Sequence, residues 1–123
     1  LHRTSPDLPP QVGVLVALAK DDAVIGKDIA QHIAAFAPQY LDRASVPTDV
    51  LEHERKVAEE TAKNEGKPEA AIAKITEGRV TGFIKEVALL EQAFAKDQKK
   101  SVAAILTEAQ NSVSAFYRFR VGQ

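Results

Sequence analysis

The chain has 123 residues, with 16 Lys and Arg against 17 Asp and Glu, and a formal net charge of -1. This balance excludes a general nucleic-acid binder, which needs a surplus of basic side chains to displace counterions. A hydrophobic content of 45% is typical of a globular chain. The absence of Cys excludes disulfides and thiolate sites, and no apolar run reaches the ~18 residues of a membrane span. Because Met is also absent, we expect residue 1 not to be a translation start and the chain to be a piece of a longer one.

The first third of the sequence predicts an extended peptide, a strand and a helix. Three prolines in residues 1–10 favour an extended entry. Residues 11–19 are rich in β-branched side chains and apolar on both faces, which predicts a central strand. Residues 23–37 switch to a helical period that stops at Pro38, and residues 39–42 have room only for a short strand.

The middle of the sequence predicts an antiparallel helical hairpin with arms at 49–64 and 68–87. Thr48 suits the N-cap of the first arm. Gly66 can adopt the left-handed capping conformation, and Pro68 suits the first position of the second arm. The hairpin turn is therefore assigned to Gly66, Lys67 and Pro68.

The positions expected to face each other in this hairpin carry mostly small side chains. Since each buried CH₂ contributes only ~0.8 kcal/mol, we expect the tip to be the least stable part. Gly78 and Gly82 interrupt the second arm, and close packing is the expected reason. The facing positions are Val50, Val57, Ala58 and Thr61 on the first arm and Ile72, Ile75 and Phe83 on the second.

The last third predicts a loop at 88–100, a short helix capped by Ser101, and a strand. The loop has three apolar anchors, which are Leu89, Leu90 and Phe94. In the strand, side chains alternate with period two, which indicates one core-facing side. We expect Ala115, Tyr117, Phe119 and Val121 on the core side and Phe116, Arg118 and Arg120 on the other.

These elements predict an α+β fold, in which a small three-stranded antiparallel sheet is packed by helices and a helical hairpin projects from it. The first part of the core is expected at residues 1–48 and the hairpin at 49–87. The second part of the core is expected at 88–123.

No catalytic constellation emerges from the residues. A small hydrolase using His2 or His32 would need a nearby activated nucleophile, and the sequence offers neither a G-x-S-x-G motif nor a glycine-rich phosphate loop. We interpret His32 as a half-exposed helix histidine. His53 follows Asp49 by four residues, but two exposed ligands make a weak metal site and a solvated helix face is the better interpretation. We therefore predict no catalytic, metal or cofactor site.

Arg118 and Arg120 are the strongest candidates for a contact with another molecule. They share one face of the last predicted strand, where they can bind a phosphate or an acidic partner. An ordinary charged, solvent-facing strand explains the same alternation and is favoured about two to one.

From residue 12 onward, several stretches resemble, in the same order, the C-terminal half of the elongation factor Ts family. Singly each stretch is weak, but together they cover nearly the whole chain. They are Val12-Gly13-Val14-Leu15-Val16, His32-Ile33-Ala34-Ala35, Gly66-Lys67-Pro68, Glu77-Gly78-Arg79 with Phe83, Leu89-Leu90-Glu91-Gln92 with Phe94 and Lys96-Asp97, and Phe116 to Gly122.

The resemblance implies a factor, without a catalytic site of its own, that binds elongation factor Tu and promotes release of its GDP. The resemblance implies that this half of the factor lies against the third domain of Tu, with His2 near the contact. Val12, Val14 and Val16 would belong to the strand beside that surface. It links the hairpin to dimerisation or to a neighbouring Tu, and leaves open a homodimer through the sheet. The implied compartment is the bacterial cytoplasm, with an organellar matrix as the alternative.

One part of the family pattern has no counterpart in this chain. The family's Thr-Asp-Phe-Val element disturbs the nucleotide and magnesium site, whereas Thr48-Asp49-Val50 lacks the Phe and sits at a predicted helix start. We therefore expect this chain to dock and dimerise without accelerating GDP release by itself. The alternative is a stand-alone helical-hairpin adaptor between proteins, with no direct contact to nucleic acid or membrane in either case.

Overall fold

The structure, a computed structural model, describes residues 11–121. In these residues it is α+β, with four α-helices and two antiparallel sheets of two strands each, so the predicted class is confirmed. Two short 3-10 helices, η1 and η2, complete the chain. The elements are β1 (Gln11–Leu18), α1 (Ala23–Phe36), η1 (Arg43–Ser45), α2 (Thr48–Asn64), α3 (Glu69–Val87), η2 (Leu89–Glu91), β2 (Ala93–Phe94), β3 (Asp97–Ser101), α4 (Val102–Glu108) and β4 (Val113–Val121).

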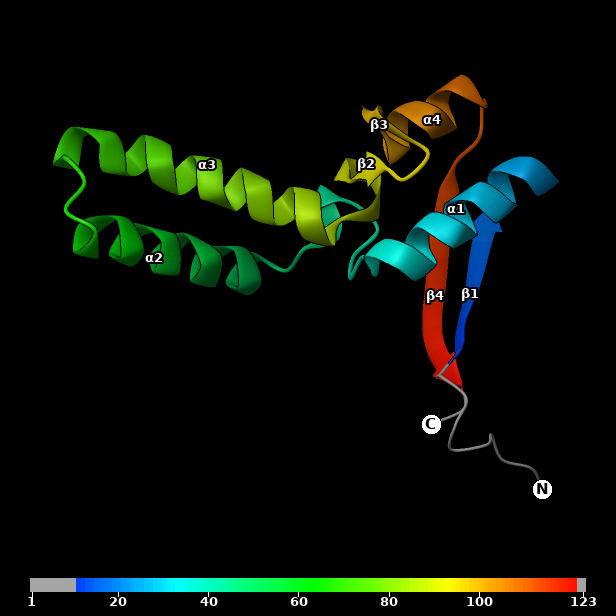
Figure 1. The fold of residues 1–123 in the computed structure, drawn as a ribbon, viewed down its shortest axis with the longest axis horizontal. Coiled ribbons are helices and arrows are strands. Elements are labelled where there is room, and N and C mark those ends of the chain that lie inside the picture. Colours follow the sequence, from blue (N-terminus) through cyan, green and yellow to red (C-terminus); the bar gives the residue numbers. More distant parts are fainter. Residues whose placement is uncertain (1–10, 122–123) are drawn as a thin grey trace. The chain divides into compact units, whose positions relative to one another are not determined.

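The chain forms two compact units. One combines the described residues up to Ala37 with those from Ala93 onward, and we call it the sheet unit; the other, Pro38–Gln92, is the hairpin unit. In the sheet unit β1 and β4 run side by side, and α1 crosses them and packs against β1 (Figure 1).

The main sheet of the sheet unit contains β1 and β4 only. They pair antiparallel from Gln11 opposite Val121 to Leu18 opposite Val113. The prediction of a central strand at 11–19 is therefore wrong within the described residues, because β1 has one neighbour and its apolar side chains remain exposed or half-buried.

The third strand expected at 39–42 is not confirmed. This stretch makes only an isolated parallel bridge, between Tyr40 and Ala88. Proline has no amide hydrogen to donate to a strand, and Pro38 leaves this stretch short. On its other side Asp42 already turns the chain, because its side chain accepts the N–H of Ser45 and caps η1.

Local sequence explains both ends of α1. The Asp22 side chain accepts the N–H of Ile25 at 3.1 Å, which satisfies one free donor of the first turn. The helix ends where Ala37 adopts a left-handed conformation with φ 47. Ile29 and Ile33 are completely buried, as their helical spacing predicts, but His32 is completely buried too. The interpretation of His32 as half-exposed is wrong.

The predicted loop at 88–100 contains more structure than expected. It holds η2 and the small hairpin of β2 and β3. Of the predicted anchors, Leu89 and Phe94 are buried and Leu90 is half-buried. Ser101 caps α4 as predicted, since its Oγ accepts the N–H of Ala104 at 3.1 Å.

In the hairpin unit, α2 and α3 run antiparallel beside each other (Figure 1). Gly66 adopts the expected left-handed conformation with φ 74. The helix starts differ from the prediction by one residue: Pro47, not Thr48, is the N-cap of α2, and Pro68 is the N-cap rather than the first residue of α3. A fixed proline φ near −60° is compatible with an extended ψ, so both prolines lie just outside the helices.

In the seam between the arms, the buried side chains of the first arm are small. The first arm buries Ala58 and Ala62, whereas Val57, expected in the seam, is 45% exposed. Gly78 and Gly82 are exposed, with nothing near the position of a Cβ, so close packing does not explain them. The second arm buries Ile72, Thr76, Val80, Ile84 and Val87.

The open end of this hairpin is fastened by backbone hydrogen bonds. Gln39 and Tyr40 both donate to the carbonyl of Val87, at 2.8 and 2.9 Å. Leu89 in turn donates to the carbonyl of Tyr40 at 2.8 Å, next to the completely buried Leu89 side chain. Residues 39–42 therefore contribute backbone pairing to the hairpin unit.

Candidate protein-binding surface

The clearest candidate for a binding surface is an apolar face of the β1–β4 sheet. Leu15 and Tyr117 are direct cross-strand partners, and they are 61% and 65% exposed. Phe119 and Val121 follow on the same face and are each 45% exposed. Opposed residues of an antiparallel pair project to the same face, so these side chains form one patch. We call it the open sheet face, and it consists of Gly13, Leu15, Ala17, Tyr117, Phe119 and Val121.

The prediction for the core side of the last strand is therefore wrong. Alternation correctly separated the two sets of side chains, but the apolar set with Tyr117 and Phe119 faces solvent. Phe116 and Arg118 are half-buried on the side of α1. This surface could not be predicted from the alternation, because the more apolar face of a strand ordinarily packs inward.

Gly13 makes room for an aromatic ring at the centre of the open sheet face. It lies opposite Phe119, whose ring lies over it so closely that a Cβ at residue 13 would overlap the ring. An aromatic ring that covers a cross-strand glycine replaces the side-chain packing that the glycine lacks. The ring of Phe119 is thereby held flat against β1.

The structure brings five of the predicted partner-binding residues together on the opposite face of this sheet. Their register pairs Val12 with Arg120 and Val14 with Arg118, and Val16 follows opposite Phe116. This is the face along which α1 lies: Leu18, two residues beyond Val16, approaches Gly26 of α1. Val14, Val16 and Arg118 are half-buried there, while Val12 and Arg120 are exposed. His2 lies outside the described residues.

Arg118 already has a structural partner. Its Nη2 donates to the carbonyl of Ala34 at 3.1 Å. In a continuing helix this carbonyl would accept the N–H of residue 38, but residue 38 is proline and has none. A cation near a helix C-terminus also interacts favourably with the helix dipole. Arg118 thus compensates for the helix stop at Pro38.

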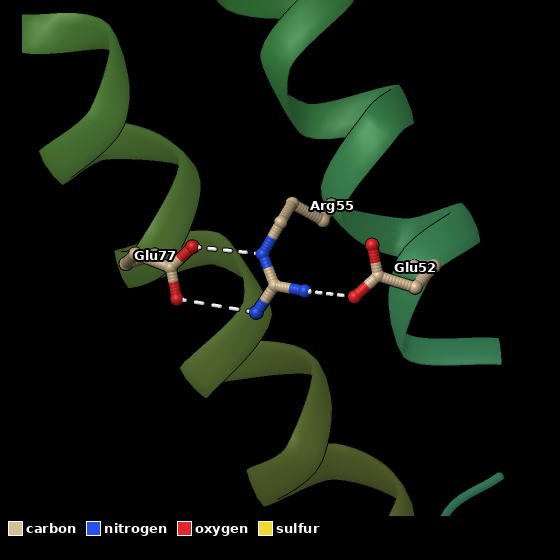
Figure 2. Close-up of polar contacts among 3 residues, drawn as sticks. All are labelled: Glu52, Arg55 and Glu77. Carbon is tan, nitrogen blue, oxygen red and sulfur yellow. Dashed lines mark hydrogen bonds and ion pairs between the residues drawn. The ribbon is translucent and has the colours of Figure 1, made fainter. Parts of the chain in front are cut away.

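A charged cluster ties the two arms of the hairpin unit together. Arg55 of α2 donates from Nε to Glu77 Oε2 at 2.9 Å and from Nη2 to Glu77 Oε1 at 3.3 Å, and its Nη1 contacts Glu52 Oε1 at 2.6 Å (Figure 2). The hydrogen bond from Arg55 lowers the pKa of Glu77, and the same bond raises the pKa of Arg55. This bidentate pair fixes the register of α2 against α3.

The hairpin-turn residues Gly66, Lys67 and Pro68 are all exposed between α2 and α3. The carbonyl of Ala62 accepts the N–H of Lys67 at 3.1 Å, which closes the end of α2. Near the same end, Arg79 pairs with Glu65 at 3.4 Å. The turn is therefore ordered by its own backbone and presents polar side chains to solvent.

The described residues contain no group of three or more His, Cys, Asp or Glu side chains that could hold a metal ion. His53 and Asp49 are both exposed on α2. A search of the same described residues finds no helix with the length and apolar character required to cross a membrane.

Comparison with known proteins identifies the family. Residues 1–123 match the sequence model of the family described as Elongation factor TS. The chain is 65% identical over 123 residues to elongation factor Ts of Acidothermus cellulolyticus, covering 100% of this chain and 45% of that protein. It is 62% identical over 122 residues to elongation factor Ts of Streptomyces griseus, covering 99% of this chain and 44% of that protein.

A more distant relative gives the same result. Elongation factor Ts of Thermobifida fusca is 53% identical over 123 residues, again covering 100% of this chain and 44% of the relative. The chain thus spans slightly less than half the length of these curated relatives. This chain belongs to the elongation factor Ts family.

Proposed function

We propose that this chain is a docking part of a translation elongation factor. It binds elongation factor Tu, and the longer protein to which it corresponds promotes release of GDP from Tu. Family membership supports the partner. The observation that carries the docking role is the open sheet face, where Leu15, Tyr117 and Phe119 are exposed together. Aromatic side chains are enriched in protein interfaces, and contiguous exposed apolar patches mark them.

The proposed docking subdomain consists of residues 1–48 and 88–123, and the inserted hairpin consists of residues 49–87. The compact units of the structure divide the chain at other positions, because residues 38–48 and 88–92 belong to the hairpin unit. A homodimer forms through the hairpin or through the sheet. The family compartment is the bacterial cytoplasm, and no cofactor or catalytic group is required, because exchange depends on binding energy alone.

Docking and exchange are separable in physical terms. An exchange factor must weaken GDP binding by the same factor by which GDP weakens binding of the exchange factor. That coupling requires contacts that disturb the nucleotide site. The resemblance assigns these contacts to a Thr-Asp-Phe-Val element, and this chain lacks that element. The chain therefore supplies affinity and orientation, and the coupling lies elsewhere in the longer protein.

Two measurements with purified elongation factor Tu test this proposal. In stopped-flow release of a fluorescent GDP, the chain leaves the rate unchanged, while full-length elongation factor Ts from A. cellulolyticus accelerates it. In titration calorimetry the chain binds Tu. Absence of binding would instead favour the adaptor alternative, and full acceleration by the chain alone would refute the separation of docking from exchange.

Variants of exposed residues locate the docking surface. Leu15→Ser or Tyr117→Ser weakens binding at least about tenfold if the open sheet face is buried in the complex. The matched control is Val24→Ser, which removes an equally exposed apolar side chain from α1. His2→Ala weakens binding only a few-fold, on the order of the loss of one contact at an interface edge. Equal losses in Val24→Ser and Leu15→Ser would show that the open sheet face is not the contact.

A further inference from the structure

Three side chains spaced one turn apart form a row on one face of α1; two of them contact the β2–β3 hairpin, and the third packs on the second. Asp28, the first, pairs with Lys96 Nζ at 2.9 Å. His32, the second, accepts the backbone N–H of Ala95 on its Nδ1 at 3.1 Å. Phe36, the third, stacks on the His32 ring with centroids 4.9 Å apart. Residues at i, i+4 and i+8 of a helix share one face, so these contacts act on one short segment.

His32 is the centre of this arrangement and is completely buried. Besides Phe36, the ring stacks on Phe94 with centroids 5.9 Å apart and planes at 23°. Phe94 is the last residue of β2 and is itself 4% exposed. Two aromatic rings and a backbone amide are thus among the neighbours of the imidazole.

The hydrogen bond to Ala95 requires a neutral imidazole. Nδ1 accepts the amide hydrogen with its lone pair, so the ring proton of the neutral form is on Nε2. In the imidazolium both nitrogens are donors, so Nδ1–H would oppose Ala95 N–H. Protonation also places a full charge in a completely buried position, which is unfavourable unless that charge is paired.

Charged groups on the neighbouring elements of the sheet unit make contacts of their own. Asp28 on α1 is paired with Lys96, and Asp97 at the start of β3 accepts the N–H of Lys99 at 3.2 Å. From β4, Arg118 donates to the carbonyl of Ala34. Asp28, one turn from His32, is thus paired with Lys96, which follows Ala95 directly. A movement of residues 95 and 96 therefore breaks the Asp28–Lys96 ion pair and the His32–Ala95 hydrogen bond together.

We propose that His32 is an acid-sensitive latch, whose protonation releases the β2–β3 hairpin from α1. The direction follows from linkage. The open state binds a proton that the closed state excludes, so the closed state loses stability as the pH falls below about 6.5, the value of an unperturbed histidine. Because opening binds one proton, the equilibrium constant for opening rises at most about tenfold for each pH unit of acidification.

Amide hydrogen exchange of the chain, followed by NMR between about pH 7.5 and pH 5.5, tests the latch. After correction for intrinsic exchange, protection of the Ala95 amide falls about fivefold between pH 6.5 and pH 5.5. Protection of the Ile84 amide in α3 stays constant, which shows that opening is local. In His32→Asn the side-chain oxygen can still accept from Ala95 but does not titrate, so protection there becomes independent of pH.

The matched control is His53→Asn, which removes an exposed histidine from α2 and leaves the pH dependence at Ala95 unchanged. A direct titration of the His32 ring signals covers the case in which His32→Asn does not fold. His32 must then change charge together with the loss of Ala95 protection. If the ring titrates while the Ala95 amide stays protected, or if Ala95 protection does not depend on pH, the latch is refuted.

Discussion

The sheet unit and the hairpin unit are stabilised in opposite ways. The sheet unit has completely buried large side chains, among them Ile29, Ile33 and Val102, yet it leaves an apolar sheet face in solvent. The hairpin unit leaves fewer large apolar side chains exposed, and in its seam α2 buries only Ala58 and Ala62, whereas α3 buries larger side chains. The free energy gained from burying apolar surface is proportional to the area buried. The sheet unit can therefore gain further stability when a partner covers its exposed apolar face, whereas the hairpin unit has little exposed apolar surface left to bury.

The largest expected effect is a loss of unfolding free energy when a buried side chain is truncated, and it should differ between the two units. Ile33→Ala removes a completely buried side chain and should cost about 3 to 4 kcal/mol of unfolding free energy, whereas Val80→Ala in the hairpin should cost about 2 kcal/mol or less. Chemical denaturation of both variants measures the difference. Equal losses of unfolding free energy would show that the seam between α2 and α3 packs as tightly as the sheet unit, and the two units would then not differ in this respect.

The next effect concerns the open sheet face. Gly13→Ala introduces a Cβ where the Phe119 ring lies, and should cost about 1 kcal/mol because the ring, which is 45% exposed, must leave its place over β1. The same denaturation experiment in a Phe119→Leu background provides the control, because a smaller side chain leaves room for the added methyl group. If Gly13→Ala is equally destabilising in both backgrounds, the ring is not the cause.

A third substitution should stabilise the hairpin unit. Within the described residues, the Oγ1 of Thr76 is buried without a hydrogen-bond partner. Thr76→Val replaces this hydroxyl by a methyl group of similar shape, so removing the unsatisfied group should raise stability by about 1 kcal/mol. Thr81→Val, at an exposed position of α3, is the control. A lower melting temperature for Thr76→Val would mean that the hydroxyl has a partner after all.

The smallest effect is the acid dependence of the hairpin. Because Arg55 lowers the pKa of Glu77 below its ordinary value of 4.5, the stabilisation by this carboxylate is present above 4.5 and is lost as the pH falls through the lowered pKa. Glu77→Gln should therefore reduce the fall in melting temperature below that pH, and Glu60→Gln, at an exposed position of α2, should not. The pH range in which Glu77 loses its charge lies well below the pH range expected for the opening at His32, so the two pH effects can be separated. An unchanged slope in Glu77→Gln would show that the Arg55 pair does not stabilise the fold.

The helical parts of this protein were predictable because their signals are local. Apolar spacing located α1, and helical composition with the turn signals at Gly66 and Pro68 located both hairpin arms. The left-handed conformation of Gly66 followed from its place after a helix, and Ser101 capped α4 as predicted. Caps and helical periods depend on residues within about four positions of each other, so they can be deduced without the rest of the chain.

The candidate site depended on contacts between residues distant in sequence. Alternation separated the two faces of β4, but only the position of α1 decided that Arg118 lies on the covered side and Tyr117 in solvent. His32 showed no sign of its burial, because its partners Phe94 and Ala95 are more than 60 residues away. Side-chain period fixes which residues share a face, whereas the side that is covered depends on the tertiary packing that finally surrounds it.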